Sequence, residues 1–318
     1  MLMPDGCTRS KRWLRASVVQ EIKGQDISNL LWALVKLGAS PEDSLLDAAA
    51  ARSQKLVHGL SVQSVANILW AYAKLGRSPG NECMEALSAH LQKRIPHASP
   101  QIIANALWAC AELGCSLPPG FVQEMLRFLH QNLAATKAMV ISAVLQACAK
   151  LGVHPEQQML QEYADHVLYL LQKGRAGLGE ISVLWWACAK MRMQPSTTFH
   201  HAVIKHVQAM LPAVQDPQHI SSLLWAYAIL QVQLPAAFLQ AAAGRLLQLL
   251  PGLSGIETCQ LAYAYAHYQY EPANGLLQAV AHHFQSMQPP ASKTRVAQMR
   301  ASYASLGLQP DVLWIRAT

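Results

Sequence analysis

The sequence predicts an all-α protein, an α-solenoid of about eight helical-hairpin repeats of 38–40 residues each. Three observations predict this fold. A ten-residue motif recurs along the chain, each copy lies in a segment with helical spacing of its apolar residues, and turn residues separate these segments at fixed places. A fixed period of this length is typical of stacked helical repeats, in which each unit buries its apolar face against its neighbours.

The motif is clearest at residues 67–76, which read Asn-Ile-Leu-Trp-Ala-Tyr-Ala-Lys-Leu-Gly. Copies at 29–38 and 105–114 are close, and weaker copies follow to the end of the chain. We define the residue at the tryptophan place as the index position of each repeat. The index positions are Trp32, Trp70, Trp108, Gln146, Trp186, Trp225, Tyr263 and Ala301, at intervals of 38 to 40 residues.

Each repeat is interpreted as two helices joined by a turn. The first helix begins about seven residues before the index position, and its end is marked by a glycine six residues after it, where a left-handed residue commonly stops a helix. A proline nine or ten residues after the index position suits the start of the second helix. The stop glycines are Gly38, Gly76, Gly114, Gly152 and Gly307. Second helices are expected at 44–57, 82–94, 121–133, 157–171, 198–211, 236–250 and 273–287.

Because no linker or change of composition interrupts the repeats, we expect one solenoid domain over residues 1–318. Residues 1–24 are interpreted as a partial capping repeat. Four cations in residues 1–15 faintly suggest the remnant of a transit peptide.

Composition narrows the function classes. The chain is 52% hydrophobic and 14% charged, which suits a continuous buried core and excludes disorder. A net charge of +7 favours polyanionic partners, nucleic acid among them. No apolar run reaches the roughly 18–20 residues of a membrane span, so no membrane partner is expected.

The seven cysteines indicate packing in a reducing compartment. They include no Cys-x-x-Cys pair, and Cys110, Cys148 and Cys188 share one repeat position that is tyrosine in other repeats. Such interchange is typical of a core position and not of a disulfide framework or a metal site.

One face of the first helix carries the residues that predict a function. At 100° per residue, the positions −7, −3, 0 and +4 relative to the index share a narrow face, which we call the stripe. In the first repeat the stripe holds Gln25, Asn29, Trp32 and Lys36. Stacked repeats would align successive stripes into a ladder. Amides can pair with the edge of a base, aromatic rings can stack on it, and lysines can neutralise phosphate.

Position −6 varies most between repeats, as sequence discrimination at the surface requires. It holds Asp26, Ser64, Ile102, Val140, Glu180, His219, Glu257 and Arg295. From the stripe and this position we predict RNA binding by Gln25, Asn29, Lys36, Gln63, Asn67, Lys74, Gln101, Asn105, Lys150, Glu180, Lys190, Gln218, His219, Gln260, Arg295 and Gln298.

Structural roles stay open for the same residues. A recurring tryptophan can be a packing wedge between helices, and a recurring asparagine can bind a backbone group of the next repeat. The lysines lie in the last turn of the first helix, where they favour the helix dipole. A second basic set on the second helices, which includes His90, Arg245 and His283, fits a solvated outer face or a phosphate track.

Catalytic patterns are lacking. The sequence contains no phosphate-binding Gly-rich loop, no Gly-x-Ser-x-Gly and no His-Glu-x-x-His, and its carboxylates are scattered. Residues 174–179 are Gly-rich and are interpreted as an insertion loop. We therefore expect no enzyme activity, no cofactor and no metal site.

The motif Asn-x-Leu-Trp-Ala-x-Ala-Lys-Leu-Gly, followed by proline, resembles the octotricopeptide repeat. It is also similar to repeats of FAST-kinase-like proteins and of RNA-editing substrate-binding complexes. The resemblance covers about residues 20–318 and is closest in the first three repeats. It implies sequence-specific binding of single-stranded RNA in transcript stability, processing, splicing or translation, with proteins of an RNA-processing complex as further partners.

The resemblance also implies a cellular compartment and bears on whether the protein cleaves RNA. It favours the chloroplast, with the mitochondrion as the alternative. Many members of these families carry a C-terminal RAP domain with a nuclease-like fold, which is not recognised here, so no RNA cleavage is expected. The alternative function is a protein-binding helical-repeat scaffold, which would show a large exposed apolar groove in place of a polar, positive one.

Overall fold

The computed structural model describes residues 21–114, 117–287 and 292–308, and in these ranges the chain is all-α. They hold fifteen α-helices, α2 to α16, and no strand. The predicted fold of consecutive helical hairpins is therefore confirmed. The predicted capping repeat lies almost wholly outside the described residues. Contacts group the chain into two units, Met1–Thr136 with Lys150–Pro155, and Lys137–Ala149 with Glu156–Thr318. Each unit is described by itself.

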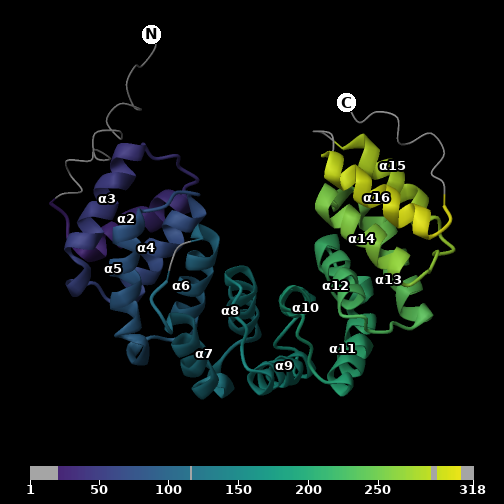
Figure 1. Cartoon of the computed structure of the whole chain (residues 1–318), viewed down its shortest axis with the longest axis horizontal. Coiled ribbons are helices and arrows are strands. Elements are labelled where there is room, and N and C mark those ends of the chain that lie inside the picture. Colours follow the sequence, from purple (N-terminus) through teal and green to yellow (C-terminus); the bar gives the residue numbers. More distant parts are fainter. Residues whose placement is uncertain (1–20, 115–116, 288–291, 309–318) are drawn as a thin grey trace, which may run out of the picture. The chain divides into compact units, whose positions relative to one another are not determined.

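The first unit contains three complete hairpins, arranged in two layers. The first helices α2, α4 and α6 pack side by side in one layer, and the second helices α3, α5 and α7 pack in the other (Figure 1). The bounds are α2 Gly24–Lys36, α3 Asp43–Lys55, α4 Val62–Lys74, α5 Asn81–Gln92, α6 Pro100–Leu113 and α7 Phe121–Gln131.

The second unit repeats this arrangement. Its first helices α10, α12, α14 and α16 pack in sequence, and so do its second helices α9, α11, α13 and α15 (Figure 1). The bounds are α8 Ala138–Leu151, α9 Gln157–Gln172, α10 Leu178–Met191, α11 Thr197–Met210, α12 Pro217–Ile229, α13 Ala236–Leu249, α14 Gly255–His267, α15 Leu276–Ser286 and α16 Lys293–Ser305.

The ends of several second helices differ from the sequence prediction. Short 3-10 turns follow α3, α5, α7, α11 and α13. They take up residues that the sequence assigns to the last residue of the α-helix or to the loop after it. The bounds of these turns are η2 Val57–Gly59, η3 Ile95–His97, η4 Leu133–Ala135, η5 Leu211–Ala213 and η6 Leu250–Gly252. The helix expected from residue 273 begins at Leu276, because Gly275 has a φ of 72°.

The left-handed stops of the first helices are confirmed at all five predicted glycines, whose φ angles lie between 60° and 69°. Repeats five, six and seven keep the same stop without glycine, at Arg192, Gln231 and Gln269, with φ angles of 53°, 56° and 49°. Among the described residues these are the only residues other than glycine with a positive φ. A left-handed conformation costs a residue with a Cβ about 1–2 kcal/mol, so the stacked fold enforces a stop that the local sequence opposes.

A tyrosine two residues after the index position joins neighbouring repeats. The hydroxyls of Tyr72, Tyr265 and Tyr303 each donate to a carbonyl 26 residues earlier, on the second helix of the preceding repeat. In other repeats this buried place holds Cys110, Cys148 or Cys188. Burial raises the pKa of the Cys148 and Cys188 thiols to about 12. The interpretation of these cysteines as core residues agrees with the structure.

Candidate nucleic-acid interface

The stripe lies at the surface in every described repeat. None of its residues is buried, whereas the residues between its rows form the core of the first-helix layer. Trp32 is 46% exposed, and Trp70, Trp108, Trp186 and Trp225 are partly exposed. The index tryptophans are therefore not buried wedges. The neighbouring Trp185, one residue before an index position, has that role, since it is fully buried.

The predicted amides of the first unit form one repeated contact. The side-chain amide of the glutamine at −7 donates to the asparagine oxygen at −3, over 3.2 Å in Gln25–Asn29, 2.8 Å in Gln63–Asn67 and 2.9 Å in Gln101–Asn105. The asparagines thus bind a stripe neighbour and not the backbone of the next repeat. We call this glutamine–asparagine hydrogen bond a clasp. Each clasp fixes the orientation of two side-chain amides and leaves the asparagine NH₂ available to a ligand.

Lysines at +4 lie over the index rings. The Lys36 ammonium is 5.6 Å from the Trp32 ring centroid and 5.8 Å from that of Trp70 in the next repeat. In the second unit, Lys190 lies 5.6 Å from Trp186 and 5.4 Å from Trp225. Lys74 similarly covers Trp108 at 4.6 Å. These distances are typical of cation–π contacts, and they show that stripes of neighbouring repeats are in register within each unit.

Two predicted residues are engaged elsewhere. The Lys150 ammonium pairs with the Glu112 carboxylate, so its charge is compensated within the protein. The Glu180 carboxylate accepts a hydrogen bond of 2.9 Å from the Gly177 backbone N–H and caps the start of its own helix. A carboxylate at this place is favoured by the helix dipole without any RNA.

The expectation that position −6 is a surface position is wrong in three repeats. Ser64, Ile102 and Val140 are buried. The reason is visible at Ser64, whose hydroxyl donates to the Gln25 side-chain oxygen of the preceding repeat over 2.8 Å. Position −6 thus faces the neighbouring first helix and supports its residue at −7.

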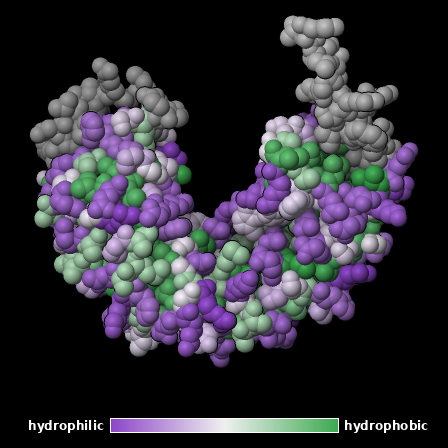
Figure 2. Space-filling model, turned by 180° about the vertical axis from the view of Figure 1, so that it is seen from behind, coloured by the Kyte–Doolittle hydropathy of each residue, from purple (hydrophilic) through white to green (hydrophobic). Residues whose placement is uncertain are grey.

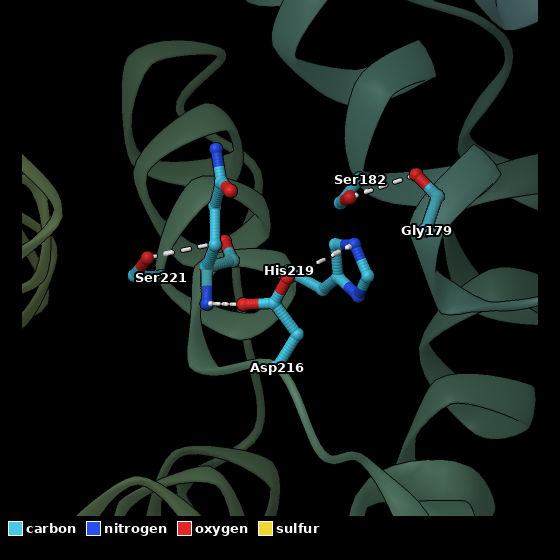
Figure 3. Close-up of polar contacts among 6 residues, drawn as sticks. Gly179, Ser182, Asp216, His219 and Ser221 are labelled. Atoms are coloured by element: carbon cyan, nitrogen blue, oxygen red, sulfur yellow. Dashed lines mark hydrogen bonds and ion pairs between the residues drawn. The ribbon is translucent and has the colours of Figure 1, made fainter. Parts of the chain in front are cut away.

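His219 occupies the same place in the second unit (Figure 3). Its ring extends from α12 toward α10, where the residue at −7 is Gly179, and a Cβ there would lie 3.3 Å from the ring. The His219 Nε2 atom is 3.8 Å from the Asp216 carboxylate, and the Gln218 backbone N–H donates to the same carboxylate over 2.9 Å. The Gln218 side chain is exposed, and His219 is partly exposed. Both stay available at the surface.

The last three first helices enclose a groove of about 770 Å³. The predicted residues Gln260, Arg295 and Gln298 line it. The index rings Trp225 and Tyr263 line it as well. The predicted residue set omits these rings, although their place at index positions is the signal that identifies them.

The second basic set has a role that neither sequence alternative covers. His90 Nε2 lies 2.9 Å from the Leu60 carbonyl oxygen, and His283 Nε2 lies 2.9 Å from that of Leu253. The Arg245 guanidinium donates to the Val214 carbonyl over 2.8 Å. In each case the acceptor lies 30 or 31 residues earlier, in the turn before the first helix of the same repeat. These side chains hold the turn in place.

Other site classes find little support. Within residues 21–114, 117–287 and 292–308, no three or more His, Cys, Asp or Glu side chains gather where they could hold a metal ion. No helix of this part of the chain is long and apolar enough to cross a membrane.

The chain matches a known family. The family model described as Tbc2 translation factor, N-terminal domain, matches residues 14–171 and also residues 49–232. The two matches overlap, as expected for a chain of similar repeats, and together they span residues 14–232, more than half of the chain. No curated protein shows a significant match.

Proposed function

Since the chain belongs to the family of the Tbc2 translation factor N-terminal domain, we propose that it acts in translation-related gene expression by binding single-stranded RNA. The stripe of the first helices is the binding surface, and each repeat contacts about one nucleotide, as in other helical-repeat readers. The observation that supports this most is the placement of Lys36 between the rings of Trp32 and Trp70, because it brings aromatic and cationic groups of successive repeats into one row.

The chemistry of the row fits RNA in three ways. A base stacked on an exposed index ring contributes about 1–3 kcal/mol. The lysine that covers the ring contributes about 0.5–1 kcal/mol there when exposed, so its displacement costs less than stacking gains. The displaced ammonium stays close to the strand and neutralises a phosphate. The asparagine NH₂ of each clasp then donates to the edge of the base.

Selection from a randomised RNA pool at moderate salt tests the proposal. We expect one enriched sequence of up to about eight nucleotides, by analogy with readers that use one repeat per base. A pool without enrichment, combined with binding that disappears near physiological salt, refutes specific recognition.

A paired variant tests the amide row. Asn67→Ala with Asn105→Ala removes two partly exposed donors, so we expect weaker binding to the selected RNA at an unchanged melting temperature. Gln123→Ala, which truncates an exposed amide on α7, is the control and should leave affinity unchanged. Loss of melting temperature without loss of affinity would instead assign the asparagines to packing.

The proposal also covers the repeat type, the compartment and the protein partners. It acts as an octotricopeptide-like, non-catalytic factor of the chloroplast, with the mitochondrion as the alternative, together with proteins of an RNA-processing complex. Imaging of the tagged protein against organelle markers tests the compartment, and sequencing of RNA that copurifies with it identifies the transcript.

A protein-binding scaffold is the second candidate. Of the six large apolar side chains exposed in the described ranges, Trp32, Met139, Ile256 and Tyr263 lie on the stripe. Figure 2 shows apolar residues in separate groups among polar ones on the visible face, which does not resemble one extended apolar surface. A purified partner protein that binds with equal affinity after nuclease treatment and is not displaced by RNA would favour this candidate.

A further inference from the structure

The groove in the second unit differs from the rest of the ladder. It has a volume of about 770 Å³ and is lined by residues of α12, α14 and α16 and of the turn that follows α14. This size lies in the range of small-molecule sites. Its shape follows from the sequence of repeat eight, where the index ring is replaced by Ala301, which also lines the groove.

The two index rings of this groove differ, because Lys190 lies over Trp225 whereas His267 stacks on Tyr263. Tyr263 is 40% exposed, and within the described residues no lysine lies over it. In repeat six the lysine place holds Ile229, and in repeat seven it holds His267, whose ring stacks on Tyr263 at 6.4 Å and 26°. The groove therefore offers a stacking surface that needs no displacement of an ammonium.

Three polar side chains of the groove, those of Gln260, Gln298 and Arg295, are available to a ligand. No hydrogen bond or ion pair within the described chain engages the side-chain amides of Gln260 and Gln298 or the guanidinium of Arg295. The clasped amides Gln63 and Asn67 show the contrast. No carboxylate lines the groove, so its charge, from Arg295, is positive. Uncommitted donors beside an exposed ring suit a planar, hydrogen-bonding, anionic ligand.

We propose that this groove is a self-contained nucleotide site. The base stacks on Tyr263, the amides of Gln260 and Gln298 pair with the edge of the base, and Arg295 binds the phosphate. The inference rests on the proposed function in that the nucleotide belongs to the bound RNA strand. It adds that this one position holds a nucleotide without help from the neighbouring ladder, and so anchors the strand on the second unit.

Titration of the full chain with AMP, GMP, CMP and UMP, followed by calorimetry, tests the site. At least one nucleotide should bind saturably with one site per chain, and inorganic phosphate or the matching nucleoside should bind at least tenfold more weakly. Tyr263→Leu keeps apolar volume and removes the ring, and Arg295→Gln removes the charge; each should weaken binding at least tenfold. Arg127→Gln on α7 and Tyr169→Leu, which removes an exposed ring on the second helix α9, are the controls, and both should bind the nucleotide like the unmodified chain.

The outcomes separate the two proposals. Absence of nucleotide binding, or binding that survives Tyr263→Leu and Arg295→Gln in folded variants, overturns the groove site, while enrichment of RNA from the pool still supports the proposed function. Binding of a nucleotide with the expected losses, but of no RNA, overturns the proposed function and leaves the groove as a site for a free nucleotide. Circular dichroism confirms folding of each variant.

Discussion

At the scale of single residues, the tyrosine two residues after the index position occurs in two states. Tyr265 donates a buried hydrogen bond of 2.9 Å to the Leu239 carbonyl. The Tyr227 hydroxyl is equally buried but donates no hydrogen bond to a backbone carbonyl in the described part of the chain. Tyr265→Phe should therefore lower the free energy of unfolding by about 1 kcal/mol, whereas Tyr227→Phe should leave it unchanged or raise it. Urea denaturation of both variants measures this, and equal losses would contradict the assignment.

A buried histidine makes stability depend on pH. His200 is 3% exposed, its ring centroid lies 4.6 Å from that of Trp185, and its Nδ1 has no hydrogen-bond partner among the described residues. Desolvation lowers its pKa below the ordinary value of 6.5. Because the folded state then favours the neutral ring, unfolding takes up a proton as pH falls below about 6.5, and stability decreases.

The measurement compares denaturation midpoints at pH 7.5 and 5.5. We expect His200→Phe, which cannot titrate, to lose less stability on acidification than the unmodified chain. His154→Gln, at an exposed position in the turn after α8, should keep the original pH dependence. An unchanged slope in His200→Phe would show that the buried ring is not the titrating group.

At the scale of the helix, the left-handed stop has a measurable cost where glycine is missing. Gln231→Gly should raise the free energy of unfolding by up to about 1 kcal/mol, because relief of strain exceeds the added freedom of the unfolded chain. The matched change Gly76→Ala should lower it by about 1–2 kcal/mol. Denaturation midpoints report both effects. Gln269→Gly is expected to gain less, since the Gln269 side chain donates to the Ala266 carbonyl over 2.7 Å. A lower stability of Gln231→Gly would contradict the strain.

Features that depend on local sequence could be predicted, whereas features that depend on contacts between repeats could not. The glycine stops and helix periods depend on residues within a few positions, so the sequence predicts them. The burial of Ser64 depends on the approach of Gln25 from another repeat, 39 positions away. The hold of His90 on the Leu60 carbonyl likewise depends on packing 30 positions apart. The groove at Tyr263 arises because Ala301 lacks a ring, and spacing alone does not reveal a missing side chain's effect.

At the scale of the whole molecule, the lysines of the stripe should dominate the salt dependence of RNA binding. Lys36→Ala with Lys74→Ala removes two cations from the ladder, so the slope of log affinity against log salt should fall by about 1.4, from roughly 0.7 per phosphate contact on a single strand. Lys55→Ala with Lys93→Ala removes the same charge from the second-helix side and should change the slope little. Equal changes in the two pairs would indicate that net charge alone, and not the ladder, attracts RNA.

The single-domain prediction for residues 1–318 stays a prediction.

The sharing of Lys36 between Trp32 and Trp70 has a consequence for how a strand would settle. A phosphate that displaces this ammonium would uncover both indoles. The first nucleotide would then break both cation–π contacts, and the second nucleotide could stack without breaking another. If the stripe binds RNA as proposed, occupancy of adjacent repeats would be energetically linked, and binding would respond more steeply to RNA concentration than binding to independent sites.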